Sequence, residues 1–274
     1  MQARFAVVGN PIAHSKSPII HKAFAEQTNI DMEYTAELVG ESDFSRFVDE
    51  FCKNGGKGLN VTVPFKIDAF NYVAEKSKRA ELAGAVNTIS FSKDGSVKGD
   101  NTDGIGMIYD IKNNNNVDIE GKRVLILGAG GAVRGVVQPL LQEKPLLITI
   151  ANRTVSKAKA VVDIFANREN ANICACSYID LDEKKYDVVI NGTSAGLSGE
   201  IPPIPSHVLS DSCFCYDMLY GDKPTSFIKW SMDNGVKNTA DGLGMLIEQA
   251  AESFLIWNGV RPDTKQVMQK LFGR

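Results

Sequence analysis

Two oppositely charged residues of the N-terminal part, Lys66 and Asp103, stand shortly after predicted strands and at the start of predicted helices. A helix dipole disfavours a cation in its first turn, so a lysine at position 66 is a candidate for proton exchange. A flexible surface lysine and a carboxylate that only caps its helix are the alternatives. A lysine and a carboxylate at strand ends of one domain also form a pair suited to general acid–base catalysis.

A glycine-rich turn, G-A-G-G-A from residue 128 to 132, follows the apolar stretch Val124 to Leu127. A strand that feeds such a turn and then a helix is typical of a dinucleotide-binding unit. The first glycine permits the turn, the second lets backbone approach a pyrophosphate, and the helix N-terminus attracts the anion. The strict pattern would place a third glycine at Val133, so an ordinary strand–turn–helix corner stays open.

The next predicted strand, residues 145–151, ends in Asn152-Arg153-Thr154, with Lys157 one helical turn further on. An NAD-binding unit usually has Asp or Glu at this strand end, which accepts hydrogen bonds from the ribose. A guanidinium instead grips a 2′-phosphate through two hydrogen bonds. The sequence therefore favours NADP(H), with a solvated surface arginine as the alternative.

Small polar side chains follow other predicted strand ends in the N-terminal part. Ser15 and Ser17 lie in the loop after strand 5–9, and Pro18 predicts Ser17 as a helix N-cap. Two hydroxyls at a helix N-terminus could equally hold a small carboxylate. Asn87 is an amide among small apolar residues and must be paired if it is buried.

Length and composition describe an ordinary folded protein of two domains. The chain has 274 residues, of which 43% are hydrophobic and 23% charged, enough to bury a sizeable core. Its net charge of −3 gives no basic footprint for nucleic acid or an anionic membrane. No apolar run approaches the ~20 residues of a membrane span, and the N-terminus does not look like a signal peptide, so a cytoplasmic protein is expected.

The five cysteines and three histidines do not indicate a metal site. Two C-x-C pairs, at residues 174/176 and 213/215, read as strand segments without a tight C-x-x-C knuckle or paired histidines. Buried reduced thiols are therefore expected, and no metal.

Strands and helices alternate along most of the chain, which predicts α/β architecture with mainly parallel sheets. An antiparallel hairpin with an Asp94-Gly95 turn is expected between strands 89–91 and 97–99. Asp263 is predicted to cap the last short helix. Further strands are expected at 33–39 and 58–63, and in the second half at 172–177, 186–190 and 214–218.

With these residues assembled, the chain resembles the shikimate dehydrogenase family over essentially its whole length. Nine motifs occur in the order that the family shows. They are G-N-P-I-A-H-S-K-S-P, N-V-T-V-P-F-K, A-G-A-V-N-T, D-N-T-D-G, G-A-G-G-A, N-R-T, N-G-T-S-A-G-L, Y-D-M-L-Y and A-D-G-L-G-M-L-I-E-Q-A-A. Val133 is no departure from the family, whose motif is G-A-G-G-A.

The resemblance implies reversible NADPH-dependent reduction of 3-dehydroshikimate to shikimate, a step towards chorismate and the aromatic amino acids. It implies Lys66 as catalytic acid/base and Asp103 as its partner. Substrate contacts are expected from Ser15, Ser17, Thr62, Lys66, Asn87, Asp103, Tyr220 and Gln249. Cofactor contacts are expected from Gly128, Ala129, Gly130, Gly131, Ala132, Asn152, Arg153, Thr154, Lys157, Thr193, Met218 and Gly242.

The resemblance also implies two α/β domains. Residues 1–103 plus 242–274 are expected to form a discontinuous substrate-binding domain, and residues 104–241 a Rossmann-type NADP-binding domain. The only expected partners are the small-molecule substrate and, at most, a second copy in a homodimer.

Three other functions compete with this interpretation. A sister enzyme that uses NAD would oxidise quinate as well as shikimate, but Arg153 and the serine pair argue against it. A catalytically silent dinucleotide-binding regulator would lack Lys66 or Asp103, and both are present. A structural or interaction protein with a Rossmann core would leave the polar residues of the N-terminal part unexplained.

Overall fold

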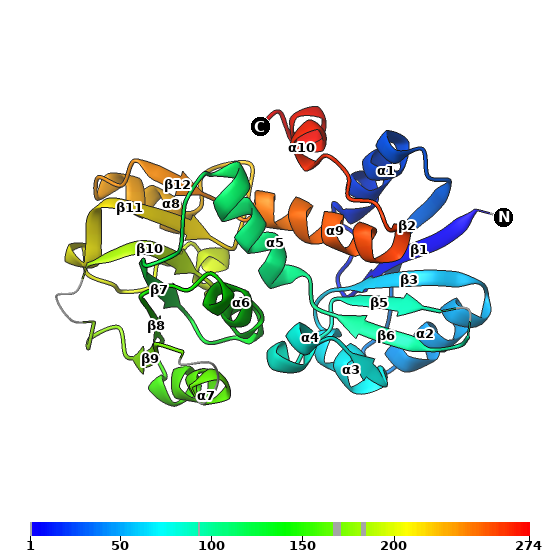
Figure 1. The fold of residues 1–274 in the computed structure, drawn as a ribbon, viewed down its shortest axis with the longest axis horizontal. Helices are drawn as coiled ribbons and strands as arrows, with labels where there is room; N and C mark the ends of the chain where they lie inside the picture. Colours follow the sequence, from blue (N-terminus) through cyan, green and yellow to red (C-terminus); the bar gives the residue numbers. More distant parts are fainter. Residues whose placement is uncertain (1, 93, 167–170, 182–184) are drawn as a thin grey trace. The chain divides into compact units, whose positions relative to one another are not determined.

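The chain divides into two compact units in the computed structural model, which describes residues 2–92, 94–166, 171–181 and 185–274 (Figure 1). The first unit contains Met1–Gly106 and Leu246–Arg274, and the second contains Met107–Met245. The chain passes from one unit to the other within helix α5 (Asp103–Tyr109) and again within helix α9 (Leu243–Asn258). The two units divide after residues 106 and 245. The predicted domain boundaries, after residues 103 and 241, lie three and four residues earlier.

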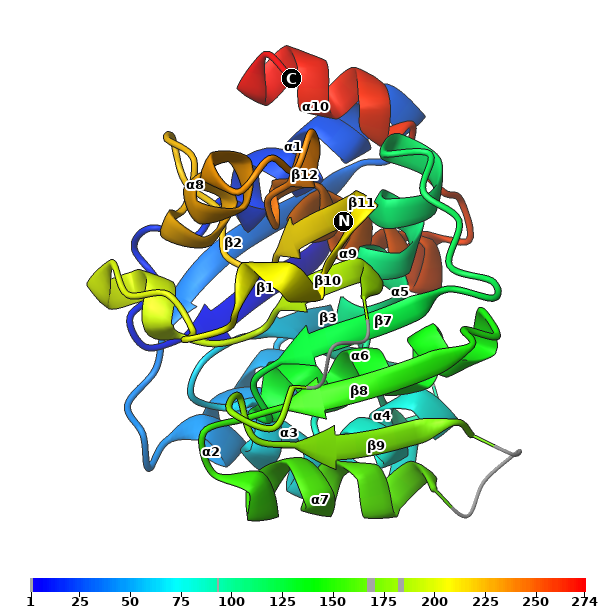
Figure 2. The same ribbon diagram turned by 90° about the vertical axis from the view of Figure 1, so that its left-hand side faces the viewer.

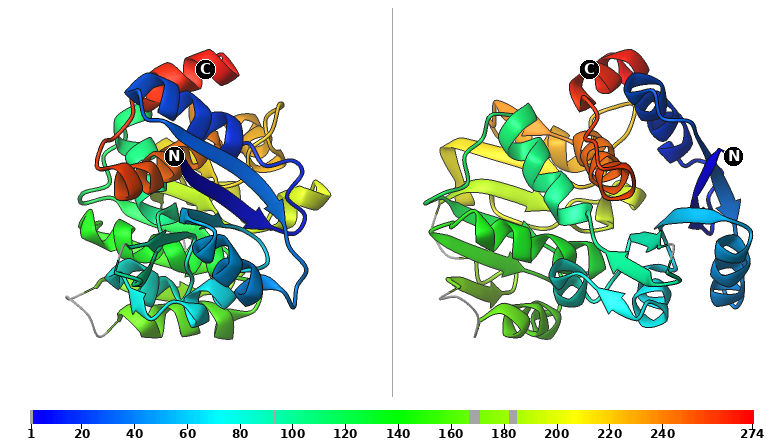
Figure 3. Two further views of the ribbon diagram at one scale, coloured as in Figure 1. Left: turned by 90° about the vertical axis from the view of Figure 1, so that its right-hand side faces the viewer. Right: turned by 45° about the vertical axis from the view of Figure 1, so that its right-hand side comes forward.

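The first unit contains a mixed six-stranded sheet in the order β2-β1-β3-β5-β6-β4. Strand β1 pairs in parallel with β2 and β3, whereas β5 runs antiparallel to both β3 and β6. Figure 3 shows β1 and β2 side by side. The strands are β1 (Ala3–Gly9), β2 (Met32–Leu38), β3 (Gly56–Val61), β4 (Glu75–Lys76), β5 (Thr88–Phe91) and β6 (Val97–Asp100).

Alternation along β1 divides the helices of this unit between the two faces of the sheet. Ala6 and Val8 belong to a buried cluster with Phe44 and Val48 of α2. On the other face, the Phe5 ring lies 4.8 Å from the Trp257 ring of α9, centre to centre. The helices are α1 (Ser17–Thr28), α2 (Phe44–Lys53), α3 (Lys66–Tyr72), α4 (Lys78–Ala83) and α10 (Thr264–Phe272), besides parts of α5 and α9.

Local signals act largely as predicted. The hairpin β5–β6 is antiparallel, and Gly95 has a φ of +84°, which its turn requires. The Asp263 side chain accepts hydrogen bonds from the backbone N–H groups of Lys265 and Gln266, so the predicted cap of α10 is confirmed.

A histidine of α1 is fully buried in this unit. The His21 ring stacks on the Tyr34 ring, with centres 4.1 Å apart and planes 6° apart. Burial lowers the pKa of His21 to about 3, because neither ring nitrogen has a hydrogen-bond partner among the described residues. The imidazole is therefore neutral at physiological pH.

Acidification from pH 7 to pH 5 is expected to lower the free energy of unfolding by about 2 kcal/mol, because His21 resists protonation in the folded chain. Below the ordinary pKa of 6.5 the unfolded chain binds a proton that the folded chain binds only near pH 3, so stability rises with pH within this window. Urea unfolding of the wild type and His21→Phe at pH 5 and 7 measures the difference. An equal pH dependence in both proteins would contradict the expectation.

The second unit contains a six-stranded sheet in the order β12-β11-β10-β7-β8-β9, with every pair parallel (Figure 2). This is the doubly wound order of dinucleotide-binding domains, in which the direction of winding switches between β7 and β10. The strands are β7 (Arg123–Leu127), β8 (Leu147–Ala151), β9 (Ile173–Cys176), β10 (Tyr186–Asn191), β11 (Leu209–Asp217) and β12 (Asn238–Ala240). The α-helices, besides parts of α5 and α9, are α6 (Gly131–Gln142), α7 (Val155–Phe165) and α8 (Ser226–Asp233).

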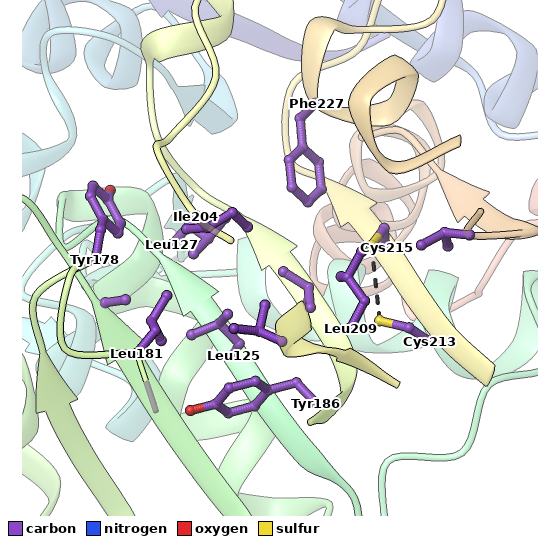
Figure 4. Packing of buried hydrophobic residues seen from close by; sticks show 14 of the residues in the cluster. Leu125, Leu127, Tyr178, Leu181, Tyr186, Ile204, Leu209, Cys213, Cys215 and Phe227 are labelled. Atoms are coloured by element: carbon purple, nitrogen blue, oxygen red, sulfur yellow. Dashed lines mark hydrogen bonds between the residues drawn. The ribbon is translucent and has the colours of Figure 1, made fainter. Parts of the chain in front are cut away.

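The core of this unit is a cluster of aliphatic and aromatic side chains (Figure 4). Leu125 and Leu127 of β7 lie in it with Phe227 of α8 and the thiols of Cys213 and Cys215, whose sulfur atoms are 4.0 Å apart. Both C-x-C pairs lie in strands, as predicted. The expectation of buried thiols is confirmed for Cys213 and Cys215 but is wrong for Cys174, which is exposed on the edge strand β9, and for the half-buried Cys52 and Cys176. Among the described residues, no three His, Cys, Asp or Glu side chains are grouped to hold a metal ion, and no helix is long and apolar enough to cross a membrane.

Candidate active site

The first unit brings Lys66 and Asp103 into contact. Lys66 Nζ donates a hydrogen bond to Asp103 Oδ2 at 2.6 Å. Lys66 is the first residue of α3, as predicted. Asp103 is the first residue of α5, so it lies inside the helix and not at the N-cap position that the sequence allowed. The Lys66 side chain is 31% exposed and that of Asp103 13%, so the lysine is partly accessible while the aspartate is largely shielded.

Asn87 holds the second oxygen of this carboxylate. Its Nδ2 donates to Asp103 Oδ1 at 2.8 Å and to Thr102 Oγ1 at 2.9 Å, and its Oδ1 accepts from the backbone N–H of Thr102 at 2.9 Å. The Asn87 side chain is 2% exposed, and these bonds satisfy the pairing that a buried amide requires. Asp103 is thereby fixed from two sides, by Lys66 and by Asn87.

Helix α9 brings Gln249 to the same place, although Gln249 lies far along the chain. The Oε1 atom of Gln249 accepts from Asn87 Nδ2 and from Thr102 Oγ1, both at 3.4 Å. The backbones of Gly106 and Gln249 approach each other closely, so that a Cβ atom on Gly106 would lie 2.6 Å from the backbone nitrogen of Gln249. Of the predicted substrate residues, Lys66, Asn87, Asp103 and Gln249 are therefore linked directly.

The predicted hydroxyl residues lie after β1 and β3 of the same unit. Thr62 follows β3, and its backbone N–H donates to the carbonyl of Val8 at 3.0 Å. Ser17 is not the N-cap of α1, because the helix already includes it and Lys16 holds the N-cap position without a side-chain cap. Instead, the backbone N–H of Ser17 donates to Oγ of Ser15 at 3.3 Å. The prediction misplaced the cap by one residue because proline marks only the first turn.

The glycine turn after β7 has the geometry that a phosphate needs. Gly128 has a φ of +101°, and a Cβ there would lie 3.1 Å from the carbonyl oxygen of Gly192. A Cβ on Gly130 or Gly131 would meet nothing within 4 Å. Helix α6 begins at Gly131 without a side-chain cap, so the first N–H groups and the dipole of this helix remain available to an anion.

Val133 occupies the place of the third glycine in the strict pattern. Its side chain is fully buried, and a Cβ on Gly192 would come within 2.4 Å of Val133 Cγ2. The close packing that the third glycine usually permits is therefore provided by Gly192, after β10, opposite a larger helix residue.

Thr193 follows strand β10, beside the switch point of the second sheet, and Met218 follows the neighbouring strand β11. Asn191 Oδ1 accepts from the Thr193 hydroxyl at 2.8 Å, and the Asn191 carbonyl accepts from the Met218 N–H at 2.9 Å. Asp217 is fully buried and accepts from Asn191 Nδ2 at 3.1 Å; its burial raises the pKa of its carboxyl group. Gly242 fits because a Cβ there would lie 2.3 Å from the Met218 carbonyl oxygen.

The loop after β8 presents two exposed cations, Arg153 and Lys157, at the start of α7. Asn152 Nδ2 donates to the Thr154 carbonyl at 2.9 Å and shapes this loop. Within the described part of the chain no ion pair involves either cation. Together with the uncapped glycine turn, these residues fit a dinucleotide that carries a further phosphate.

Tyr220 belongs to the second unit. It follows β11, is 38% exposed, and its partial burial raises the pKa of its hydroxyl group.

Sequence reasoning missed a buried polar cluster behind Asn87, formed by Asn60, Thr88, Thr102 and Ser253. Asn60 Nδ2 donates to the Asn87 carbonyl at 3.2 Å and to Ser253 Oγ at 3.0 Å. Ser253 Oγ lies 2.8 Å from Thr88 Oγ1 and 3.2 Å from Thr102 Oγ1. An available signal was Asn60 itself, since an amide between the apolar residues Leu59 and Val61 needs partners.

Three family profiles match the chain. The profile of the shikimate dehydrogenase substrate binding domain matches residues 7–89. The shikimate/quinate 5-dehydrogenase profile matches residues 110–198, and that of the shikimate 5′-dehydrogenase C-terminal domain matches residues 242–272.

Individual proteins are similar over nearly the full length. A shikimate dehydrogenase (NADP(+)) of Cellvibrio japonicus is 52% identical over 267 residues, which are 97% of this chain and 96% of that protein. The crystal structure of an Ael1 enzyme from Pseudomonas putida has a TM-score of 0.94 and 42% identity, covering 98% of both chains. The shikimate 5-dehydrogenase of Thermus thermophilus, solved with NADP(H) and shikimate, has a TM-score of 0.86 and 29% identity over 98% of both chains.

Proposed function

Because the chain belongs to the shikimate dehydrogenase family, we propose that Lys66 is its catalytic acid/base and that Asp103 orients it. The chain is an NADP-dependent oxidoreductase that interconverts 3-dehydroshikimate and shikimate in aromatic biosynthesis. The observation that carries the catalytic assignment is the 2.6 Å contact between Lys66 Nζ and Asp103 Oδ2, with Asn87 and Gln249 beside it.

NADPH, when bound, supplies the hydride that the ketone carbon of 3-dehydroshikimate receives. Negative charge then builds on the ketone oxygen, and the Lys66 ammonium group donates a proton to it. Asp103 keeps Nζ oriented through its hydrogen bond, and Asn87 keeps the carboxylate itself in place. In the reverse direction, neutral Lys66 accepts the proton from the substrate hydroxyl.

The proposal extends to the residues that hold the two ligands. Ser15 and Ser17 offer neutral hydroxyls to the substrate carboxylate, while Asn87, Asp103 and Gln249 face its ring hydroxyls. Thr62 and Tyr220 stay predicted substrate residues. On the cofactor, Gly128 to Ala132 would receive the pyrophosphate, Asn152 to Lys157 the ribose 2′-phosphate, and Thr193, Met218 and Gly242 the nicotinamide end.

We further propose that the enzyme works in the cytoplasm, where a biosynthetic reductase meets its NADPH. A monomer or a homodimer stays the prediction for its assembly. The substrate-binding domain of residues 1–103 plus 242–274 and the NADP-binding domain of residues 104–241 correspond in this proposal to the first and second units.

Absorbance of the reduced nicotinamide tests the function, with shikimate or quinate as substrate and NADP⁺ or NAD⁺ as cofactor. Turnover should be strongest with shikimate and NADP⁺. Preferred turnover of quinate with NAD⁺ would identify the sister enzyme instead. NADPH binding by fluorescence without turnover of any pair would leave only a dinucleotide-binding regulator.

A further inference from the structure

A chain of largely shielded ion pairs in the first unit involves Asp100, three residues before Asp103. The guanidinium of Arg79, on α4, donates from Nε to Asp100 Oδ1 at 2.6 Å and from Nη2 to Asp100 Oδ2 at 2.9 Å. Nη2 also donates to Glu252 Oε1 at 3.1 Å. The three side chains are between 13% and 21% exposed, and none of them has a role in the proposed chemistry.

Asp100 is hydrogen-bonded to the segment that leads to Asp103. It ends β6, and its Oδ1 accepts from the backbone N–H of Asn101 at 2.7 Å as well as from Ser77 Oγ at 2.5 Å. Its backbone carbonyl accepts from the N–H of Asn87 at 3.0 Å. Asp100 is thus hydrogen-bonded to Asn101, two residues before Asp103, and to Asn87, whose side chain binds the Asp103 carboxylate.

Glu252 lies on the helix that carries Gln249. It lies on α9 between Gln249, three residues earlier, and Ser253, the next residue. Its second oxygen accepts from Arg261 Nη1 at 2.9 Å, and Arg261 Nη2 donates to the fully buried Glu248 at 2.8 Å. The helix position that carries Gln249 is therefore tied to Arg79 through Glu252.

An arginine is suited to this task because its planar fork fixes both the distance and the angle of a carboxylate. Burial works against the charge of Arg79, but hydrogen bonding and the charges of Asp100 and Glu252 raise the pKa of its guanidinium. Well-packed apolar residues usually stabilise a fold as well as buried ion pairs do, so stability alone does not explain the arrangement. Its distinctive effect is to join β6 and α9 in one fixed geometry.

We propose that Arg79 is a positioning residue, which acts through Asp100 and Glu252 to hold Asp103 and Gln249 in register with Lys66. This inference rests on the proposed roles of Lys66 and Asp103. Arg79 touches none of the reacting groups, and it acts by fixing the two segments that present them.

Steady-state kinetics of Arg79→Lys tests the inference, since lysine keeps the charge but lacks the fork. We expect kcat/KM for shikimate to fall by about 10- to 100-fold, because a misplacement of ~1 Å costs about 10²-fold. The Kd for NADPH, which binds the second unit, should stay unchanged. The circular dichroism spectrum should match that of the wild type, which unfolding of the first unit would not allow. Lys98→Met is the matched control, since Lys98 lies on β6 two residues before Asp100 in an exposed ion pair with Glu75. It should behave as wild type.

A double-mutant cycle with Lys66→Ala separates positioning from a general structural effect. If Arg79 acts through the acid–base pair, Arg79→Lys should cost less than about threefold in the Lys66→Ala background. An equal loss in both backgrounds, or a folded Arg79→Lys with wild-type kcat/KM, would overturn the inference. Wild-type kcat in Lys66→Ala alone would instead refute the proposed role of the pair.

A second variant keeps the test decisive if Arg79→Lys fails to fold. Arg79→Met with Asp100→Leu replaces the central ion pair by apolar side chains and leaves no unpaired charge between these two positions. It should fold, as judged by circular dichroism, yet show the same loss in kcat/KM for shikimate. Wild-type kcat/KM in this folded double variant would overturn the proposal.

Discussion

Lys66→Ala is expected to lower kcat by 10²- to 10⁴-fold in both directions, on the order of what a positioned proton donor contributes. The Kd for shikimate should change by less than about tenfold, because most of the proposed substrate hydrogen bonds remain. A loss confined to kcat marks an interaction that is made mainly in the transition state. Initial rates from nicotinamide absorbance, with shikimate binding measured by calorimetry, give both quantities.

Lys57→Ala is the control for this experiment. Lys57 lies on β3, the strand that precedes the site, and its side chain is exposed. Its removal should leave kcat and KM unchanged. Wild-type kcat in Lys66→Ala would show that another group supplies the proton.

Arg153→Ala is expected to raise KM for NADP⁺ by about 10- to 100-fold, because a hydrogen bond to a charged group contributes about 1.5–3 kcal/mol. KM for NAD⁺ should stay nearly constant, since NAD⁺ carries no 2′-phosphate. The preference of the enzyme for NADP⁺ over NAD⁺ would then fall by about the same factor. Initial rates with each cofactor at saturating shikimate measure this ratio.

Lys159→Ala provides the comparison, since Lys159 is an exposed cation on the same helix, α7, outside the predicted cofactor residues. It should leave the ratio unchanged. Equal effects of Arg153→Ala and Lys159→Ala would indicate a general charge effect and no specific phosphate contact.

Periodicity and strand-end chemistry predicted much of the fold. Strand β7 was found because helices cover both faces of a parallel sheet, so an inner strand of such a sheet is an unbroken apolar run. Strands β4 and β12 were missed, since two and three residues are too few to show a pattern. Their pairing depends on the neighbouring strands β6 and β11, which sequence periodicity does not report.

The candidate site, like the fold, could be predicted from the sequence only in part. Lys66 and Asp103 could be predicted as helix-start residues after strands, because that is a local property of the sequence. The network behind them could not, since Asn60 and Ser253 are 193 residues apart and meet only when α9 packs on the sheet. The same holds for the bond between Arg79 and Glu252, which are 173 residues apart.

The contact between Val133 and Gly192 has a consequence for how such chains evolve. Residues 133 and 192 share one space beside the glycine turn. The turn therefore requires that the combined volume of their two side chains is small, and it does not require glycine at one fixed position. A search that demands glycine at the helix position overlooks chains in which the neighbouring strand end provides the space. Positions 133 and 192 should therefore covary among relatives, with glycine needed at only one of them.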